Sequence, residues 1–268
     1  MNLKNDIKAF LFDVDGTLVD KDCLCSEKML YCLKELKNRG YDLVINSGRA
    51  IFSSKKVLIK NDILDLFDYF YGCNGIEFED VKNKIHTYVD YVYDDSIKFL
   101  NKFFCEDYLA LACYHDEKEL LINHMISDRE MMDTWSKRRF VSFREYDFNS
   151  LEKSPKLIVV FLKEHKKELD EKIVSINDSR FDMFYSGEDV MEIVPKGLSK
   201  GKSVIDFANL KNINPKAILT AGDCENDVPA LINGTGVYVG NKNVKVAYSV
   251  DDVYKDGLAN FLYENFLS

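Results

Sequence analysis

The segment DVDGTL, residues 13–18, is the feature that most constrains the fold of this chain. It directly follows the apolar run AFLF, residues 9–12, whose length and aromatic content are typical of a buried parallel strand. Gly16 allows a tight exit from such a strand, and the Thr17 hydroxyl can tie the loop down. Two carboxylates are therefore expected at the carboxyl end of a buried strand, where open α/β sheets place their active sites.

Both flanks of the chain alternate short strands with helices. We expect strands at residues 41–46, 66–71, 217–221 and 237–239, and helices at 27–39, 50–60, 200–210 and 257–266. Ser26 and Ser199 are expected to cap two of these helices. Strands joined by short helices form parallel crossovers, which bring the strand ends to one edge of the sheet. Asp13, Ser47 and Asn74 are therefore expected to meet at that edge.

From near residue 81, the middle of the chain shows a different order of expected strands and helices. It predicts strands within 85–93 and at 108–114, 119–123, 156–162, 181–186 and 190–194, with helices at 96–104, 128–138 and 164–174. Consecutive strands without intervening helices indicate antiparallel pairing, so we expect an α+β insertion between two α/β flanks. Trp135 is expected to pack between sheet and helices.

Composition excludes several classes of partner. The formal net charge of -9 argues against nucleic acid, because phosphate backbones are bound by basic surfaces. No apolar run approaches the roughly 20 residues needed to cross a bilayer, and the N-terminal segment has no apolar signal core. We expect a cytoplasmic protein with no membrane partner, either a monomer or a weak homodimer.

The seven cysteines are expected to be reduced thiols, since their number is odd and their spacing irregular. Cys23, Cys25 and Cys32 could be imagined as a soft-metal site, but no second close pair follows at zinc-ribbon spacing. The four histidines are scattered, without a ligand pair at helical spacing. A soft-metal centre is therefore the weaker hypothesis.

Two further loops in the C-terminal flank carry charged residues at the starts of helices. Lys200 lies in the first turn of a predicted helix, where a cation opposes the helix dipole, which indicates that it serves a negative group. The segment GDCEND, residues 222–227, places Asp223 and Asp227 just beyond a predicted strand. Hard Mg²⁺ prefers carboxylate oxygens, and Asp13 and Asp223 fit that preference.

This set of residues suits phosphoryl transfer. That reaction needs an in-line nucleophile, a bridging cation and fixed donors for the phosphoryl oxygens. One carboxylate of the pair Asp13 and Asp15 can attack phosphorus to form an aspartyl-phosphate. The other can protonate the leaving oxygen and then take a proton from water.

The motifs resemble those of the haloacid dehalogenase superfamily, in particular its Cof-like subclass IIB phosphatases. The resemblance rests on residues 13–18, 47–49, 200–201 and 222–227, with support from Asn74-Gly75, Glu192-Ile193 and residues 236–241. It implies an α/β fold: a Rossmann-like core of residues 1–82 and 190–268, with residues 83–189 forming a large α+β cap domain. Asn46, Cys224 and Ala230 depart from the family pattern but are not catalytic groups, so these departures concern the substrate and not the reaction.

The resemblance also assigns roles. It implies that Asp13 is the nucleophile and Asp15 the general acid/base, and that Lys200 neutralises the phosphoryl group and orients the nucleophile. Substrate contacts are expected from Ser47, Gly48, Thr17, Asn74 and Asn226. Mg²⁺ is expected on Asp13, on the main-chain carbonyl of Asp15 and on Asp223, with Asp227 supporting the metal shell.

The resulting hypothesis is a Mg²⁺-dependent phosphatase that acts on a small phosphorylated metabolite, most simply a sugar phosphate. A phosphomutase on the same substrate class is the first alternative, because it would use the same aspartate pair. A non-catalytic protein that senses a phosphometabolite is the second.

Overall fold

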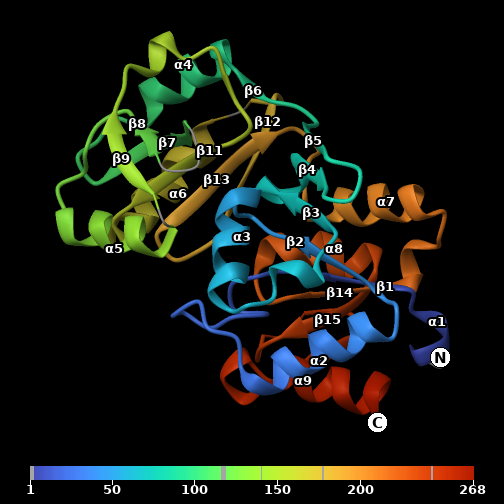
Figure 1. Cartoon of the computed structure of the whole chain (residues 1–268). Helices are drawn as coiled ribbons and strands as arrows, with labels where there is room; N and C mark the ends of the chain where they lie inside the picture. The colour runs from blue at the N-terminus through green and yellow to red at the C-terminus, as the bar shows by residue number, and fades with distance from the viewer. Residues whose placement is uncertain (1–2, 116–118, 140, 177, 243) are drawn as a thin grey trace. The chain divides into compact units, whose positions relative to one another are not determined.

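The computed structural model describes residues 3–115, 119–139, 141–176, 178–242 and 244–268. The chain divides into two compact units (Figure 1). The discontinuous unit comprises Met1–Val89 and Ser199–Ser268, and the inserted unit comprises Asp90–Leu198. Within the described ranges, no helix is both long and apolar enough to span a bilayer.

The discontinuous unit contains an eight-stranded sheet with the order β16-β15-β14-β1-β2-β3-β4-β5. Strands β16 to β3 along this order are parallel, and β4 and β5 continue the sheet antiparallel. The strands are β1 (Ala9–Phe12), β2 (Asp42–Asn46), β3 (Tyr69–Gly72), β4 (Glu77–Asp80), β5 (Ile85–Tyr88), β14 (Ile218–Gly222), β15 (Thr235–Val239) and β16 (Tyr248–Val250). Phe12 pairs with Ile45 of β2 and with Ala221 of β14, so the loops after these three strands leave the sheet side by side.

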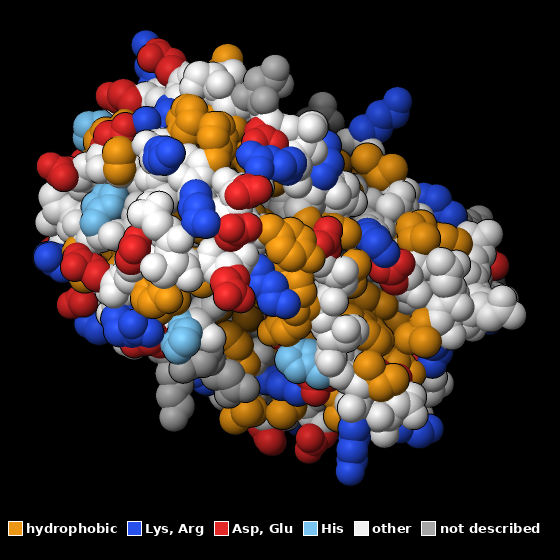
Figure 2. All heavy atoms as spheres, turned by 90° about the horizontal axis from the view of Figure 1, so that it is seen from above, with side chains coloured by type: hydrophobic (Ala, Val, Ile, Leu, Met, Phe, Trp, Pro, Cys, Tyr) orange, Lys and Arg blue, Asp and Glu red, His pale blue; other side chains and the backbone are white. Residues whose placement is uncertain are grey.

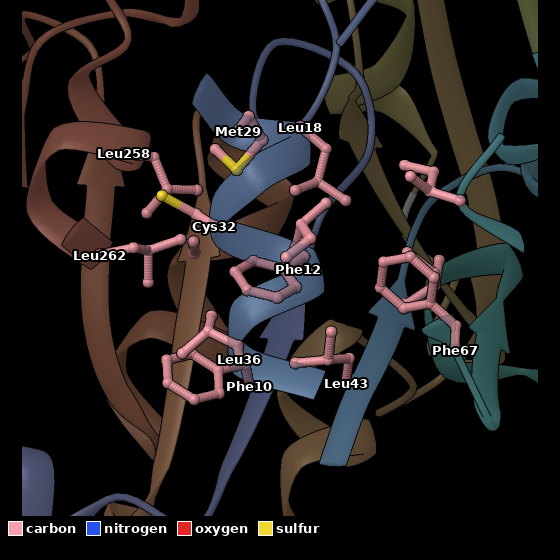
Figure 3. Close-up of a cluster of buried hydrophobic side chains, with 14 of the residues drawn as sticks. Phe10, Phe12, Leu18, Met29, Cys32, Leu36, Leu43, Phe67, Leu258 and Leu262 are labelled. Carbon is pink, nitrogen blue, oxygen red and sulfur yellow. The ribbon is translucent and has the colours of Figure 1, made fainter. Parts of the chain in front are cut away.

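Helices cover both faces of this sheet. They are α1 (Leu3–Asp6), α2 (Glu27–Asn38), α3 (Ile51–Lys60), α7 (Lys200–Lys211), α8 (Val228–Asn233) and α9 (Gly257–Leu262), with short turns η1 (Leu64–Leu66), η2 (Cys73–Gly75), η5 (Pro215–Ala217), η6 (Glu225–Asp227), η7 (Val253–Lys255) and η8 (Tyr263–Leu267). On one face, Phe10 and Phe12 pack among side chains of α2 and α9 (Figure 3). On the other, Ala9 and Leu11 pack against α7. Burial on both faces explains the uninterrupted apolar sequence of β1.

Two helix starts in this unit were predicted to have serine caps, and the structure confirms one. The Ser26 Oγ accepts a hydrogen bond of 3.1 Å from the Met29 N–H, which caps α2 as expected. Ser199 precedes α7 at the N-cap position, but its side chain makes no capping hydrogen bond. Its carbonyl oxygen accepts from the Lys202 N–H instead, as the first bond of the helix.

The inserted unit contains a six-stranded sheet with the order β12-β13-β11-β7-β8-β9 and a separate two-stranded pair, β10-β6. Its neighbouring strands are antiparallel except β8 and β9. The elements are β6 (Val92–Tyr93), α4 (Asp94–Phe103), β7 (Leu109–Tyr114), β8 (Glu119–Ile122), α5 (Arg129–Arg139), β9 (Ser142–Glu145), η3 (Phe148–Ser150), β10 (Lys153–Ser154), β11 (Leu157–Phe161), η4 (Lys163–His165), α6 (Lys166–Ser175), β12 (Phe181–Tyr185) and β13 (Val190–Pro195). A hydrophobic cluster of its own lies between the sheet and α4 and α6. Trp135 is buried and packs on Phe143, as predicted.

The division into units differs from the predicted boundaries at 82/83 and 189/190. The β4-β5 hairpin pairs with β3 and so extends the discontinuous unit to residue 89. At the second boundary, β13 pairs with β11 and β12, so residues 190–198 belong to the inserted unit. The hairpin was not predicted because β4, with two half-buried residues, lacks a clear apolar pattern, although β5 lies within the predicted strand region 85–93.

Candidate active site

Three aspartates from two loops converge at the carboxyl edge of the central strands. Asp13 follows β1, Asp223 follows β14, and Asp227 lies in the turn η6. One carboxylate oxygen of each lies within 4.8 Å of the others. Asp13 and Asp227 are buried, and Asp223 is half-buried. The predicted approach of the two acidic motifs, residues 13–18 and 222–227, is therefore present in the fold.

Lys200 joins two of these carboxylates. Its Nζ donates to the Asp13 Oδ1 at 2.7 Å and to the Asp227 Oδ1 at 2.5 Å. The lysine is buried, so its charge depends on these partners. The Asn46 amide donates to the Lys200 carbonyl at 3.1 Å and fixes the first residue of α7 against the end of β2. The lysine thus serves a negative group, as its position against the helix dipole predicted.

The loop that carries Asp223 is shaped by the second aspartate of its motif. The Asp227 Oδ2 accepts the main-chain N–H groups of Asp223 at 3.1 Å and Cys224 at 3.0 Å. Gly16 brings the first motif against this loop: a Cβ at Gly16 would lie 2.4 Å from the Asp223 Oδ2, and its φ of +74° also favours glycine. The two acidic motifs therefore approach as closely as the backbone allows.

Burial and mutual repulsion raise the proton affinity of the aspartates. Burial raises the pKa of Asp13 well above its usual value; Lys200 opposes this increase, and Asp227 and Asp223 add to it. Burial, then Asp227, raises the pKa of Asp223 to about 6. Burial by itself would lower the pKa of Lys200, but Asp13 and Asp227 outweigh it, so that the lysine stays charged with a raised pKa.

Asp15 has a different partner from the other aspartates. The Arg49 Nε donates to its Oδ2 and the Arg49 Nη2 to its Oδ1, both at 2.6 Å, which is the bidentate geometry of a guanidinium on a carboxylate. Arg49 was part of the motif singled out in the sequence but received no role there. Its place in the loop after β2, next to the predicted phosphate contacts Ser47 and Gly48, was the signal that could have given it a role in the site.

Four of the predicted phosphate-binding residues, Ser47, Gly48, Asn74 and Asn226, lie on neighbouring loops that hydrogen bonds connect. Ser47 is buried and its Oγ accepts the Arg49 N–H at 3.1 Å, beside Gly48 on the loop after β2. Asn74, buried at φ +60°, donates its N–H to the Ser47 carbonyl, and its Oδ1 accepts from the Asn226 amide at 3.1 Å. Hydrogen bonds thus link residues 47, 74 and 226 across three loops.

Thr17 lies apart from these residues. Its side chain is fully buried, and within the described ranges its Oγ1 makes no hydrogen bond, so the hydroxyl does not tie the loop down as predicted. It lines a small pocket with Ser26, the cap residue of α2, and Gly257 of α9. The loop is closed by its backbone instead, through the Gly16 N–H on the Val19 carbonyl at 2.8 Å.

The donors fit a divalent cation. The carboxylates of Asp13, Asp15, Asp223 and Asp227 face only the cations of Lys200 and Arg49 among the ion pairs described at this edge, which leaves an excess of two negative charges. The Asp223 Oδ1 is buried and accepts no hydrogen bond from any described residue. Buried carboxylates normally have partners, so an oxygen-liganded cation such as Mg²⁺ would satisfy both conditions.

Comparison with known proteins is consistent with this geometry. A family model for haloacid dehalogenase-like hydrolases matches residues 10–262. A Buchnera aphidicola protein with a provisional phosphatase name is 25% identical over 266 residues, covering 95% of this chain and 94% of its own. The 5-amino-6-(5-phospho-D-ribitylamino)uracil phosphatase YwtE of Bacillus subtilis is 24% identical, with 83% of each chain covered. The solved structure of BT4131, described as a HAD subclass IIB sugar phosphatase, aligns with a TM-score of 0.78 at 18% identity, covering 96% of this chain and 98% of its own.

The match to the family model spans nearly the whole chain, and both acidic motifs lie inside it. The chain belongs to the haloacid dehalogenase-like hydrolases. The superfamily and the fold class expected from the sequence are confirmed.

Proposed function

We propose that this protein is a Mg²⁺-dependent phosphomonoesterase that hydrolyses a small phosphorylated metabolite through an aspartyl-phosphate. The observation that carries the proposal is Asp13, held by Lys200 at the end of β1 and surrounded by Asp223 and Asp227. Asp13 and Asp223, with the main-chain carbonyl of Asp15, would hold the metal, and Asp227 would support them. Bound Mg²⁺ supplies positive charge that balances the phosphoryl oxygens.

The chain's own residues can carry both half-reactions. An Asp13 oxygen forms a bond to phosphorus while the bond from phosphorus to the leaving oxygen breaks, and Asp15 gives its proton to that oxygen. Asp15 then takes a proton from water, whose oxygen attacks phosphorus, releases phosphate and restores the Asp13 carboxylate. Lys200 keeps Asp13 oriented throughout, because its hydrogen bond holds one carboxylate oxygen in place.

The phosphoryl group needs fixed donors as well as a nucleophile. The Ser47 Oγ accepts from the Arg49 N–H, which leaves its own proton free to be donated to a phosphoryl oxygen. The main-chain N–H of Gly48 and the amide of Asn226 are the further donors that we assign to the substrate.

A sugar phosphate is the substrate class that we favour. The support comes from the names of the relatives, of which one acts on a phosphorylated ribityl compound and another is a sugar phosphatase. The experiment is a phosphate-release screen over sugar phosphates, nucleotides and cofactor phosphates, with Mg²⁺ and with EDTA. We expect release from one or more sugar phosphates that EDTA abolishes. Absence of release from every compound would refute the proposal, and isomerised sugar phosphate without release would indicate a mutase.

A further inference from the structure

Arg49 is a buried cation that forms an ion pair with a partly exposed carboxylate. Its side chain is 3% exposed, whereas that of Asp15 is 43% exposed. Both hydrogen bonds to Asp15 measure 2.6 Å, and they use different nitrogens and different oxygens. A parallel pair of this kind fixes the plane of a carboxylate as well as its distance.

The guanidinium group also contacts two residues other than Asp15. Its Nη1 donates to the Oγ of Ser53, a fully buried residue in the first turn of α3, at 3.1 Å. Its Nη2 also lies 3.7 Å from the Cys23 Sγ. These contacts orient the end of the side chain, so the fork presented to Asp15 has little rotational freedom.

The Arg49 backbone is fixed to the neighbouring loops. Its N–H donates to the Ser47 Oγ, and its carbonyl accepts the Cys73 N–H at 2.8 Å. Two residues later, the Ile51 N–H at the start of α3 donates to the Oε2 of the buried Glu77 at 2.8 Å. Main chain and side chain of Arg49 are therefore both positioned by hydrogen bonds to the loop after β2, to η2 and to α3.

We propose that Arg49 is a positioning residue that holds the Asp15 carboxyl group in the orientation needed for proton transfer. The inference rests on the proposed function, in which Asp15 is the acid/base. A half-exposed aspartate without this partner would sample several rotamers, and proton transfer needs the carboxyl group within hydrogen-bond reach of the leaving oxygen. Arginine suits the task because it stays charged at all accessible pH values and spans both oxygens.

The test compares substrates whose leaving groups differ in their need for a proton. The value of kcat/KM reports the step in which Asp13 is phosphorylated, so it is measured with two substrates. The glycerol of β-glycerophosphate would leave as an alkoxide unless it is protonated. The p-nitrophenol of p-nitrophenyl phosphate leaves readily as an anion. For Arg49→Ala we expect a loss of tenfold or more with β-glycerophosphate, as part of the roughly 100- to 10 000-fold that acid–base catalysis typically contributes. With p-nitrophenyl phosphate we expect a loss of about threefold or less, since little proton transfer is needed.

Two measurements separate positioning from a structural effect. Guanidinium ion at millimolar concentration should restore part of the β-glycerophosphate activity of Arg49→Ala, whereas equimolar sodium chloride should not. Arg49→Lys, which keeps the charge but cannot span both oxygens, should show the same substrate split to a smaller degree. If Arg49→Ala does not fold, Arg49→Lys carries the test. Arg39→Gln is the matched control, because Arg39 bonds the carbonyls of Phe266 and Leu267 and should leave both rates unchanged.

The outcomes distinguish the inference from the function on which it rests. Wild-type protein inactive on both compounds and on the substrate panel would remove the proposed function. The positioning role alone would be overturned by a different result. In that case the wild type is active and Asp15→Asn loses more activity on β-glycerophosphate than on p-nitrophenyl phosphate, but folded Arg49 variants lose activity equally on both substrates. The split in both variants, with guanidinium rescue, supports the positioning role.

Discussion

Burial and the nearby carboxylates of Asp227 and Asp223 disfavour the negative charge of Asp13. The Lys200 ammonium group, which donates a hydrogen bond to Asp13, favours that charge and so helps to keep the nucleophile ionised. Asp13→Asn removes that charge but keeps an oxygen that can accept from Lys200. We expect the variant to lose phosphate release by at least a thousandfold, because an amide cannot form the phosphoryl-enzyme. Its thermal midpoint in metal-free buffer at pH 7.5 should equal or exceed that of the wild type, since a disfavoured buried charge is gone.

A folded Asp13→Asn protein with residual activity near that of the wild type would exclude Asp13 as the nucleophile. Asp206→Asn is a matched control, because Asp206 pairs with Lys202 on α7 and should affect neither measurement appreciably.

Asp223 gives the metal site a pH dependence with a definite sign. Its pKa in the folded protein is raised to about 6, so metal-free protein binds a proton more tightly there than the unfolded chain does. That contribution to stability is complete below the unfolded pKa near 4 and is lost as the pH rises through about 6. Mg²⁺ competes with the proton, so it should raise the thermal midpoint more at pH 7.5 than at pH 5.

Thermal unfolding at both pH values, with and without Mg²⁺, measures this difference. In Asp223→Asn the Mg²⁺ effect at pH 7.5 should be largely lost. An equal Mg²⁺ effect in that variant, or a larger effect at pH 5, would contradict the assignment of Asp223 as a ligand.

At the scale of single elements, α2 depends on a local signal that the sequence displays. The Ser26 Oγ accepts the Met29 N–H, and Leu33 and Leu36 of the same helix lie in the main hydrophobic cluster. Ser26→Ala should lower the free energy of unfolding by about 1 kcal/mol, which chemical denaturation can measure. Ser199→Ala should have a much smaller effect, because that side chain makes no capping bond. Similar losses for both variants would argue against the difference between the two helix starts.

The central sheet of the inserted unit contains a buried ion pair. The Lys156 Nζ lies 2.7 Å from the Oε2 of Glu192 in β13, and both side chains are at most 2% exposed. Lys156→Met alone should destabilise the protein by about 3–5 kcal/mol, because it removes the cation beside a buried carboxylate. Adding Glu192→Leu should recover most of that loss, since a well-packed apolar pair replaces two charges. Denaturant titration of both variants tests this, and a double variant no more stable than the single one would contradict it.

The sequence predicted elements best where the pattern was strong and local. The buried run of β1 and the cap of α2 required no tertiary information, and both are as predicted. The strands β4, β9 and β16 were not predicted, because half-buried and exposed edge strands lack the apolar alternation that identifies a strand. Their pairing depends on neighbours far along the chain, which propensity does not report.

The candidate site shows the same division. Motif spacing and strand topology were sufficient to bring Asp13, Asp223 and Lys200 together. The Arg49–Asp15 pair was not predicted, because it requires the χ angles of two side chains on adjacent loops. Thr17 is the opposite case: its hydroxyl matched a plausible local role, but packing against α2 and α9 buries it away from hydrogen-bond partners among the described residues.

At the scale of the whole chain, acidic residues outnumber basic ones. The formal net charge is -9, and Figure 2 shows acidic and basic side chains interspersed on the face it displays. A polyanion should therefore compete poorly with a small phosphate ester for the site. We expect excess double-stranded DNA to leave p-nitrophenyl phosphate hydrolysis unchanged at low salt. Inhibition that disappears as salt is raised would instead reveal a basic surface.

The two units have separate hydrophobic clusters, and the residues assigned to the metal all belong to the discontinuous one. A ligand that binds only the folded form of one unit slows every opening that disrupts its site and leaves other openings unchanged. Hydrogen exchange followed by mass spectrometry should therefore show that Mg²⁺ increases protection in β1, β14 and the loops after them. Exchange in β7 and β11 of the inserted unit should not change.

The control for this experiment is Asp223→Asn, in which Mg²⁺ should alter neither region. A uniform Mg²⁺-dependent increase in protection across both units of the wild type would show that they unfold as one cooperative body, in spite of their separate cores. Protection confined to the discontinuous unit would mean that the inserted unit folds on its own hydrophobic cluster and that substitutions there can change stability without changing metal affinity.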